Sequence, residues 1–227
     1  PLDQALETGV KILDITNPIG KGQRQLILGD RVTGKTTIAT DTILNQRGKG
    51  VICVYCCIGK AEASLGKVVE LFATHPGVLD YTIIVSATAS SSVGQQYLAP
   101  YVASSVGEYF MREEHRDVFV VFDDLTKHAW VYRQMSLLLG RSPGRDAYPG
   151  DIFYIHSQLV ERAGRLKPAL GSGSMTFFPV IETVQGDLTS YISTNLISMT
   201  DGQLFVSTPL FSEGFKPAID IGLSVSR

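Results

Sequence analysis

A single motif constrains the fold of this chain more than any other feature of its sequence. Residues 29–36 read GDRVTGKT, which matches the pattern G-x-x-x-x-G-K-[ST] at every fixed position. A short apolar run, residues 25–28, precedes the motif, and residues 35–46 continue it with helical character. In this strand–loop–helix setting, Gly29 and Gly34 let the backbone turn its N–H groups inward, where the positive end of the helix reinforces them. The motif therefore predicts a loop that binds phosphate groups.

This loop provides most of the candidate binding residues. We expect the Lys35 ammonium to reach the β and γ phosphates of a nucleotide, and the Thr36 hydroxyl to bind Mg²⁺. Arg31 leaves two interpretations open, a contact with a phosphate or a pair with a neighbouring carboxylate. The candidate nucleotide-binding residues of this segment are Gly29, Asp30, Arg31, Val32, Thr33, Gly34, Lys35, Thr36 and Thr37.

A second apolar run ends in a carboxylate that suits the same metal ion. Residues 118–122 read VFVVF, and Asp123 and Asp124 follow them. A strand that ends in an acid can place that acid beside Mg²⁺, usually through a coordinated water, and the phosphate loop upstream strengthens the assignment. Thr36 and Asp123 are therefore the candidate metal ligands. Asp124 is at least as well suited to cap the helix predicted to start near residue 126.

The rest of the chain alternates short β-rich runs with longer helical ones. This rhythm predicts βαβ units, and therefore an α/β fold with a largely parallel sheet flanked by helices. The Gly- and Pro-rich stretch 140–151 is predicted to be a loop. No break in composition and no internal repeat divides the chain, which favours one domain. The predicted strands are 25–28, 51–58, 81–86, 118–122 and 174–184, and the predicted helices are 35–46, 61–73, 95–112, 125–139 and 152–166.

Composition argues against several classes of protein. The 20 Lys+Arg against 22 Asp+Glu give a net charge of −2, which does not support a basic nucleic-acid-binding surface. No run approaches the roughly 18 apolar residues of a membrane-spanning helix, and residues 1–7 lack the basic cluster of a secretion signal. Cys53, Cys56 and Cys57 share one apolar run, so buried thiols are a simpler interpretation than a disulfide or a metal site.

Several longer stretches carry a resemblance to a known family. Together they resemble the central nucleotide-binding domain of the alpha subunit of F-type ATP synthases, over nearly the whole chain. The matching stretches are GKGQR (20–24), GDRVTGKT (29–36), DDLTKHAWVYRQMSLLL (123–139), GRDAYPGD (144–151), PVIET (179–183) and GLSVSR (222–227).

The resemblance implies a RecA-like P-loop NTPase fold. Residues 1–227 would form a single nucleotide-binding domain, a fragment of a longer subunit whose N-terminal β-barrel and C-terminal helical domain are absent here. The implied ligands are ATP or ADP with Mg²⁺. The implied partners are beta subunits, which alternate with alpha subunits in a ring, and a central gamma shaft. The domain would bind Mg-ATP, be largely non-catalytic, and serve proton-driven ATP synthesis and hydrolysis.

The same resemblance implies further residues and a location. Arg227 ends the segment that resembles the family's arginine finger, which stabilises the transferring phosphoryl group in the neighbouring catalytic site. Phe211, Lys216 and Pro217 match the region near the adenine ring. The complex would be peripheral, on the cytoplasmic face of a bacterial inner membrane or its equivalent in the mitochondrial matrix or plastid stroma. The chain would meet the membrane only through that complex, would have no nucleic-acid partner, and would be a monomer alone.

Two positions depart from the family's pattern. Catalytic subunits have Gly-Glu where this chain has Gly59-Lys60, and alpha subunits usually have Gln in place of the lysine. A protonated ammonium cannot act as a base for water, so Lys60 near the γ-phosphate predicts retention of ATP without hydrolysis; the alternative is that Lys60 bends into solvent. Glu62 is a substitute base or an ordinary acid in a first helical turn. Val32 stands where alpha subunits usually have Gln, which predicts weakened binding.

Other interpretations stay open at this point. Glu182, near the end of the run 174–184, lies near the nucleotide or makes a structural ion pair. The chain could also be an autonomous RecA-like ATPase motor of the export ATPase or helicase type, although the near-neutral charge and Lys60 argue against both. A ring spacer that binds nothing is a third possibility, against which the intact phosphate loop argues.

Overall fold

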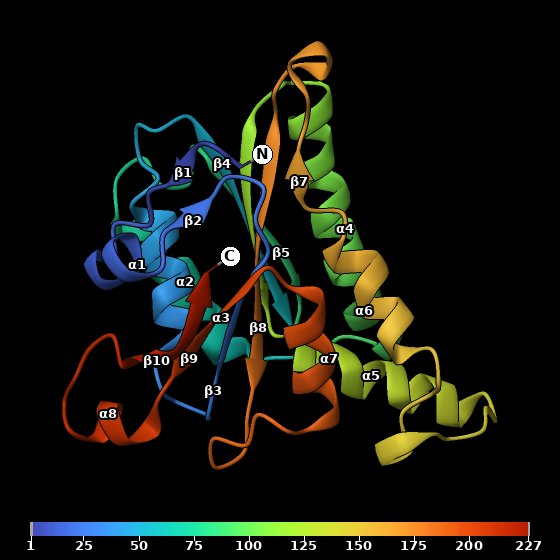
Figure 1. Cartoon of the computed structure of the whole chain (residues 1–227). Helices are drawn as coiled ribbons and strands as arrows, with labels where there is room; N and C mark the ends of the chain where they lie inside the picture. Colours follow the sequence, from blue (N-terminus) through green and yellow to red (C-terminus); the bar gives the residue numbers. More distant parts are fainter. Residues whose placement is uncertain (1, 227) are drawn as a thin grey trace.

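A computed structural model describes residues 2–226 as a mostly parallel sheet with helices on both faces (Figure 1). The strand order is β10-β9-β3-β8-β6-β4-β5, and β7 adds to β8. The pairs are parallel except for β9–β10 and β7–β8, and β1 and β2 form a separate antiparallel ribbon. The strands are β1 (Ala5–Leu6), β2 (Ile19–Gly20), β3 (Gln25–Gly29), β4 (Val51–Ile58), β5 (Thr82–Ala87), β6 (Asp117–Asp123), β7 (Gly164–Arg165), β8 (Ser174–Glu182), β9 (Gly202–Val206) and β10 (Ile219–Ser226).

Alternation along the strands builds a hydrophobic core on each face of the sheet. In β3, Leu26 and Leu28 belong to the core covered by α4, α5, α6 and α7, whereas Ile27 belongs to the core covered by α1, α2 and α3. Because both faces are covered, the central strands are apolar throughout. The helices are α1 (Lys11–Thr16), α2 (Lys35–Leu44), α3 (Glu62–Thr74), α4 (Val93–Arg112), α5 (Leu125–Leu138), α6 (Ile152–Val160), α7 (Tyr191–Met199) and α8 (Thr208–Ser212), with short 3-10 turns η1 (Arg145–Ala147) and η2 (Pro168–Leu170).

The α/β architecture predicted from the sequence is confirmed, but one predicted helix is too long. The predicted strand 51–58 coincides with β4, whereas the predicted helix 152–166 ends at Val160. Gly164 and Arg165 instead form β7, where Gly164 pairs with Met175 of β8. The Arg165 guanidinium also pairs with the carboxylate of Asp3. These long-range pairings outweigh a helical pattern that glycine already weakens.

The chain beyond residue 184 contains elements that the sequence analysis did not predict. The structure has α7, β9, α8 and β10 there. β9 pairs in parallel with β3, so Gly29 at the start of the phosphate loop lies opposite Val206. This C-terminal segment therefore provides one wall beside the loop.

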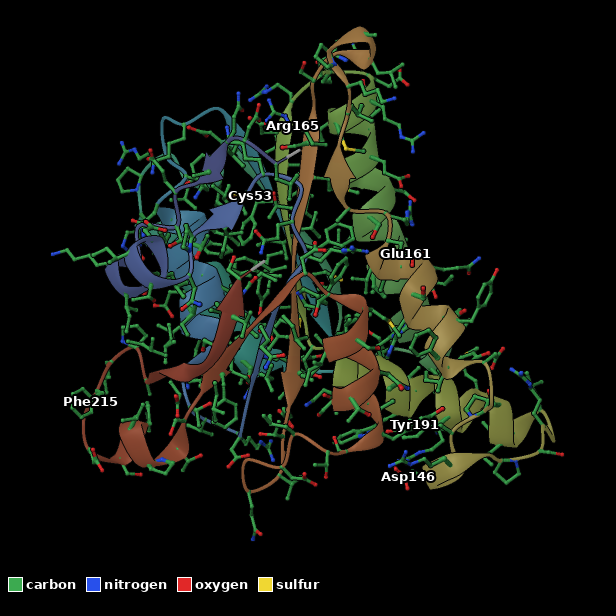
Figure 2. All side chains as sticks on the ribbon, in the orientation of Figure 1. Cys53, Asp146, Glu161, Arg165, Tyr191 and Phe215 are labelled. Carbon is green, nitrogen blue, oxygen red and sulfur yellow. The ribbon has the colours of Figure 1, made fainter. Side chains whose placement is uncertain are left out.

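The predicted loop 140–151 contains only the short turn η1 and lies against α7. Figure 2 shows Tyr191 of α7 near the segment that carries Asp146. The Arg145 guanidinium stacks over the Tyr191 ring at 5.1 Å from its centroid, and Tyr148 is buried. Aromatic and cation–π contacts thus hold a segment with little regular structure.

The cysteines are buried, as predicted. Cys53, Cys56 and Cys57 lie in the interior strand β4, and burial raises the pKa of the Cys57 thiol to about 11. These side chains therefore pack as small apolar groups. Within residues 2–226, none of the helices combines the length and apolar character needed to cross a bilayer.

Candidate nucleotide-binding site

The loop between β3 and α2 has the backbone geometry that phosphate binding needs. A Cβ atom on Gly29 would lie 2.5 Å from the carbonyl oxygen of Val206, so the close approach of β9 requires glycine. Gly34 has a φ of 99°, a left-handed conformation that favours glycine. Helix α2 begins at Lys35, and the N–H groups of its first turn have no intrahelical partner. The loop therefore presents N–H donors to an anion.

The Asp30 carboxylate is held by hydrogen bonds within the protein. Its carboxylate accepts hydrogen bonds from the Thr183 hydroxyl at 2.6 Å, the Gly186 N–H at 2.8 Å and the Thr208 hydroxyl at 2.9 Å. Burial raises its pKa, but these donors outweigh burial and hold the pKa below its usual value. Neither Asp30 nor Gly29 lines the pocket described below. Both residues therefore shape the loop beside the cavity.

Lys35 is held within the loop as a buried ammonium. Its side chain is 7% exposed, and Nζ donates to the Asp30 carbonyl oxygen at 2.5 Å. Burial lowers the pKa of Lys35, against the opposing effect of nearby carboxylates, of which Glu182 acts most strongly. An ammonium has three N–H donors, so most of its capacity is available to a ligand.

Asp123 at the end of β6 accepts several hydrogen bonds on one oxygen. The Thr36 hydroxyl donates to Asp123 Oδ2 at 2.9 Å across the intervening strand β8, and the Tyr55 hydroxyl donates to the same atom at 2.6 Å. Burial and the neighbouring Asp123 raise the pKa of Tyr55, so it stays a donor. Asp123 is 1% exposed, and its other oxygen, Oδ1, has no partner within residues 2–226. The structure therefore brings the two predicted metal ligands together.

Lys60 faces the same carboxylate and does not bend into solvent. Its Nζ lies 2.6 Å from Asp123 Oδ2 and donates to Thr36 Oγ1 at 2.9 Å. The side chain is only 18% exposed. Of the two interpretations left open by the sequence, the structure favours the one in which this positive charge enters the phosphate end of the pocket.

The predicted Mg²⁺ does not fit this arrangement of side chains. The two expected ligands, Thr36 and Asp123, supply oxygens of the kind that Mg²⁺ binds. An ion bound directly by Thr36 Oγ1 and Asp123 Oδ2 would lie where the Lys60 ammonium lies, because that ammonium already contacts both atoms. Two cations cannot share this position, so a metal would require Lys60 to leave.

Asp124 and Glu182 are joined by a lysine that the sequence analysis did not identify. Asp124 caps α5 by accepting from the Lys127 N–H at 2.8 Å. Lys127 Nζ lies 3.3 Å from both the Asp124 and the Glu182 carboxylates. Burial raises the pKa of Asp124. Burial by itself would lower the pKa of Lys127, but the nearby Asp124 and Glu182 carboxylates outweigh it and raise that pKa. Asp124 thus has the capping role, and Glu182 makes an ion pair at the edge of the pocket.

The loop forms one end of a cavity of about 880 Å³, within the usual size range for ligand pockets. Phe211, Lys216 and Pro217, the predicted adenine region, line the same cavity. The Lys216 ammonium lies 5.6 Å from the Phe211 ring centroid. Phe215 lies in the chain between Phe211 and Lys216, and Figure 2 shows its side chain projecting outward from the fold. The remaining predicted loop residues that line the cavity are Arg31, Val32, Thr33, Gly34, Lys35, Thr36 and Thr37.

Val32 adopts a conformation that its side chain disfavours. Its φ is 61°, in the left-handed region, and the side chain is 80% exposed. A β-branched residue in this region is strained, whereas asparagine tolerates it. We expect Val32→Asn to raise the unfolding free energy by about 1 kcal/mol, measured by urea denaturation. Val184, which is 76% exposed, is the matched control, and Val184→Asn should change stability by less than about 0.5 kcal/mol. Equal changes in unfolding free energy for the two substitutions would contradict the prediction that Val32 is strained.

Two predicted residues lie outside the pocket or outside the described structure. Glu62 is exposed and accepts from the Ser90 hydroxyl at 2.5 Å, and it does not line the cavity. Arg227, the predicted finger, lies outside the described residues 2–226.

The structure adds Tyr55 and Lys127 to the site. Both line the cavity, and neither was identified from the sequence. Tyr55 is in a continuous apolar strand, where nothing marks one aromatic residue as a hydrogen-bond donor to a distant acid. Lys127 follows Asp124 at the i+3 spacing of a helical ion pair. This spacing is the feature of the sequence that could have indicated its role.

Comparisons with known proteins agree with this geometry. The model of the ATP synthase alpha/beta family, nucleotide-binding domain, matches residues 9–226. The chain is 57% identical over 224 residues to the ATP synthase subunit alpha of Clostridium botulinum strain Hall, covering 99% of this chain and 44% of that protein. It is 56% identical over 226 residues to the same subunit of strain Eklund 17B, covering 100% of this chain and 44% of that protein. The chain therefore spans less than half the length of these curated relatives.

Proposed function

Because the chain belongs to the ATP synthase alpha/beta family and is an alpha-type nucleotide-binding domain, we propose that it binds ATP or ADP without hydrolysing it. The observation that carries this proposal is the shared cavity, which joins the phosphate loop at one end to Phe211, Lys216 and Pro217 at the other. Lys35 and the N-terminus of α2 would bind the phosphates. Phe211 and Pro217 offer apolar surface for the base.

The proposal that ATP is not hydrolysed rests on the lack of a suitable base beside the phosphates. Hydrolysis needs a group that takes a proton from the attacking water, and the Lys60 ammonium cannot do so. The Asp123, Asp124 and Glu182 carboxylates all face ammonium groups. Asp41, the other acid that lines the cavity, lies about 9 Å along the axis of α2 from Lys35.

Nucleotide retention tests this function directly. The chain is incubated with ATP, free nucleotide is removed, and bound ATP and ADP are quantified by chromatography. We expect ATP to be retained, with no more ADP than in a protein-free control, because the carboxylates of Asp123, Asp124 and Glu182 all face ammonium groups. Glu62→Gln is the matched variant, and it should change neither quantity. Steady ADP formation that this substitution abolishes would contradict the non-catalytic proposal and favour an autonomous ATPase motor. Absence of retained nucleotide would favour a ring spacer.

The wider role is also a proposal, because the relatives extend well beyond this chain. We propose that residues 1–227 are one domain of a longer alpha subunit, which alternates with beta subunits around a gamma shaft in a membrane-peripheral complex that makes ATP from a proton gradient. In that setting Arg227 would act in the catalytic site of the neighbouring beta subunit. The 57% identity to a bacterial ATP synthase subunit alpha supports this assignment.

A further inference from the structure

Lys60 is positioned by the backbone before it. Gly59 has a φ of 63°, and a Cβ atom there would lie 2.9 Å from the Gln96 side chain and 3.1 Å from that of Lys127. The chain therefore passes through a narrow gap at the end of β4, and Lys60 emerges directly at the phosphate end of the cavity. Its ammonium reaches across to α2 and β6, where it contacts Thr36 and Asp123.

The contacts of this ammonium are those expected of a bound cation. It lies 2.6 Å from the Asp123 carboxylate oxygen and 2.9 Å from the Thr36 hydroxyl oxygen. These two residues are the ones predicted to hold Mg²⁺. Of its three N–H donors, two have partners within residues 2–226, which leaves one for a ligand. The remaining donor is available to a phosphate oxygen in the cavity.

We propose that the Lys60 ammonium substitutes for Mg²⁺ in this site, so that the chain binds ATP or ADP without a divalent cation. This inference rests on the proposed nucleotide binding. Six basic and four acidic side chains line the cavity, which gives a surplus of two positive charges before any metal enters. Lys35 and Lys60 both line this cavity, so the phosphate groups of one nucleotide could bind both ammoniums.

Titration of ATP by calorimetry, in excess MgCl₂ and in excess EDTA, tests the inference. For the parent chain we expect ATP to bind at least as tightly in EDTA as in MgCl₂, because the lysine supplies the charge and Mg²⁺ in solution competes with the site for ATP. Lys60→Gln should lose about tenfold or more in EDTA, the worth of one charge-assisted hydrogen bond, and should recover affinity with MgCl₂ because Thr36 and Asp123 become available. Lys60→Arg keeps the charge and should likewise bind ATP at least as tightly in EDTA as in MgCl₂.

Two controls separate the possible failures. Lys167 is exposed and does not line the cavity, so Lys167→Gln removes a charge of the same sign away from the site and should leave binding in EDTA unchanged. Circular dichroism checks that each variant is folded. If the parent chain binds ATP tightly in MgCl₂ and more than tenfold less tightly in EDTA, the inference is wrong and the proposed function stands. If it binds ATP in neither buffer, both are wrong.

Electron paramagnetic resonance of Mn²⁺ gives an independent measurement that uses the metal as the probe. Added to the parent chain with ATP, Mn²⁺ should show only the spectrum of ATP-bound ion in solution. The Lys60→Gln complex should show an additional immobilised signal, because the metal then enters between Thr36 and Asp123. An immobilised signal of equal intensity in the parent chain would overturn the inference.

Discussion

Replacing Lys35 with alanine is expected to weaken ATP binding by about 10²–10⁴-fold, because two charge-assisted hydrogen bonds to phosphate oxygens are worth roughly 1.5–3 kcal/mol each. The Lys35 ammonium is buried, and the partner that the structure gives it within residues 2–226 is the Asp30 carbonyl. Burial lowers its pKa, because the charge is poorly solvated in this position. The negative charge of a phosphate would stabilise this ammonium, which is why its removal should have a large effect.

Calorimetric titration with ATP measures the loss, and Lys67→Ala provides the control. Lys67 is an exposed lysine of α3 on the wall of the same cavity, so its removal should change the affinity by less than about threefold. Lys35→Ala removes a buried charge, and we expect it to unfold at the same urea concentration as the parent chain or at a higher one. Loss of binding would therefore not reflect loss of the fold. Unchanged affinity of Lys35→Ala would contradict the assignment of the phosphate loop.

The second large effect is expected from a pair of buried histidines, His128 in α5 and His156 in α6, packed against α4. His128 and His156 are both 0% exposed, and their rings meet through His128 Nδ1 and His156 Nε2 at 3.3 Å. His128 Nε2 lies 3.1 Å from the Tyr97 carbonyl oxygen, and the Tyr97 ring stacks on His128. Burial lowers the pKa of His128 to about 4. Burial together with the neighbouring ring lowers that of His156 to about 3.

These pKa values predict a loss of stability in mild acid. Between pH 6.5 and pH 4 the unfolded chain binds protons at both histidines and the folded chain does not, so the unfolding free energy falls as the pH falls. With an ordinary histidine pKa near 6.5 in the unfolded chain, the loss is about 2 kcal/mol per histidine at pH 5, and about 4 kcal/mol for the pair. The contribution of the two neutral histidines to the unfolding free energy is present in full well above pH 6.5 and is lost as the pH falls below it.

Urea denaturation at pH 7 and pH 5 measures this dependence. His156→Leu should reduce the difference by about half, because one of the two proton-binding groups is gone. His115, which is exposed, is the control, and His115→Gln should leave the difference unchanged. Ring proton resonances of the folded chain give a second check, since those of His128 and His156 should not titrate between pH 8 and pH 5. Titration of either ring in that range would contradict the prediction.

The sequence by itself determined the parts of this protein that depend on local pattern. The phosphate loop could be identified because its glycines and Lys35 act through the adjoining backbone. The strands 51–58 and 118–122 could be identified because strands covered on both faces are continuously apolar. Asp123 followed from its place at the end of such a strand. The resemblance then grouped Phe211, Lys216 and Pro217 with the loop, and all three line its cavity.

Only the tertiary structure decided the contacts between residues that are distant in the chain. It placed Lys60 on Asp123 and Thr36, where the sequence left two directions open for that side chain. It turned Asp30 away from the cavity, toward Thr183 and Thr208. It also paired β9 with β3 and ended α6 early. The physical reason is that these outcomes depend on which strands become neighbours and where a long side chain finds a partner, and neither leaves a periodic signal in the sequence.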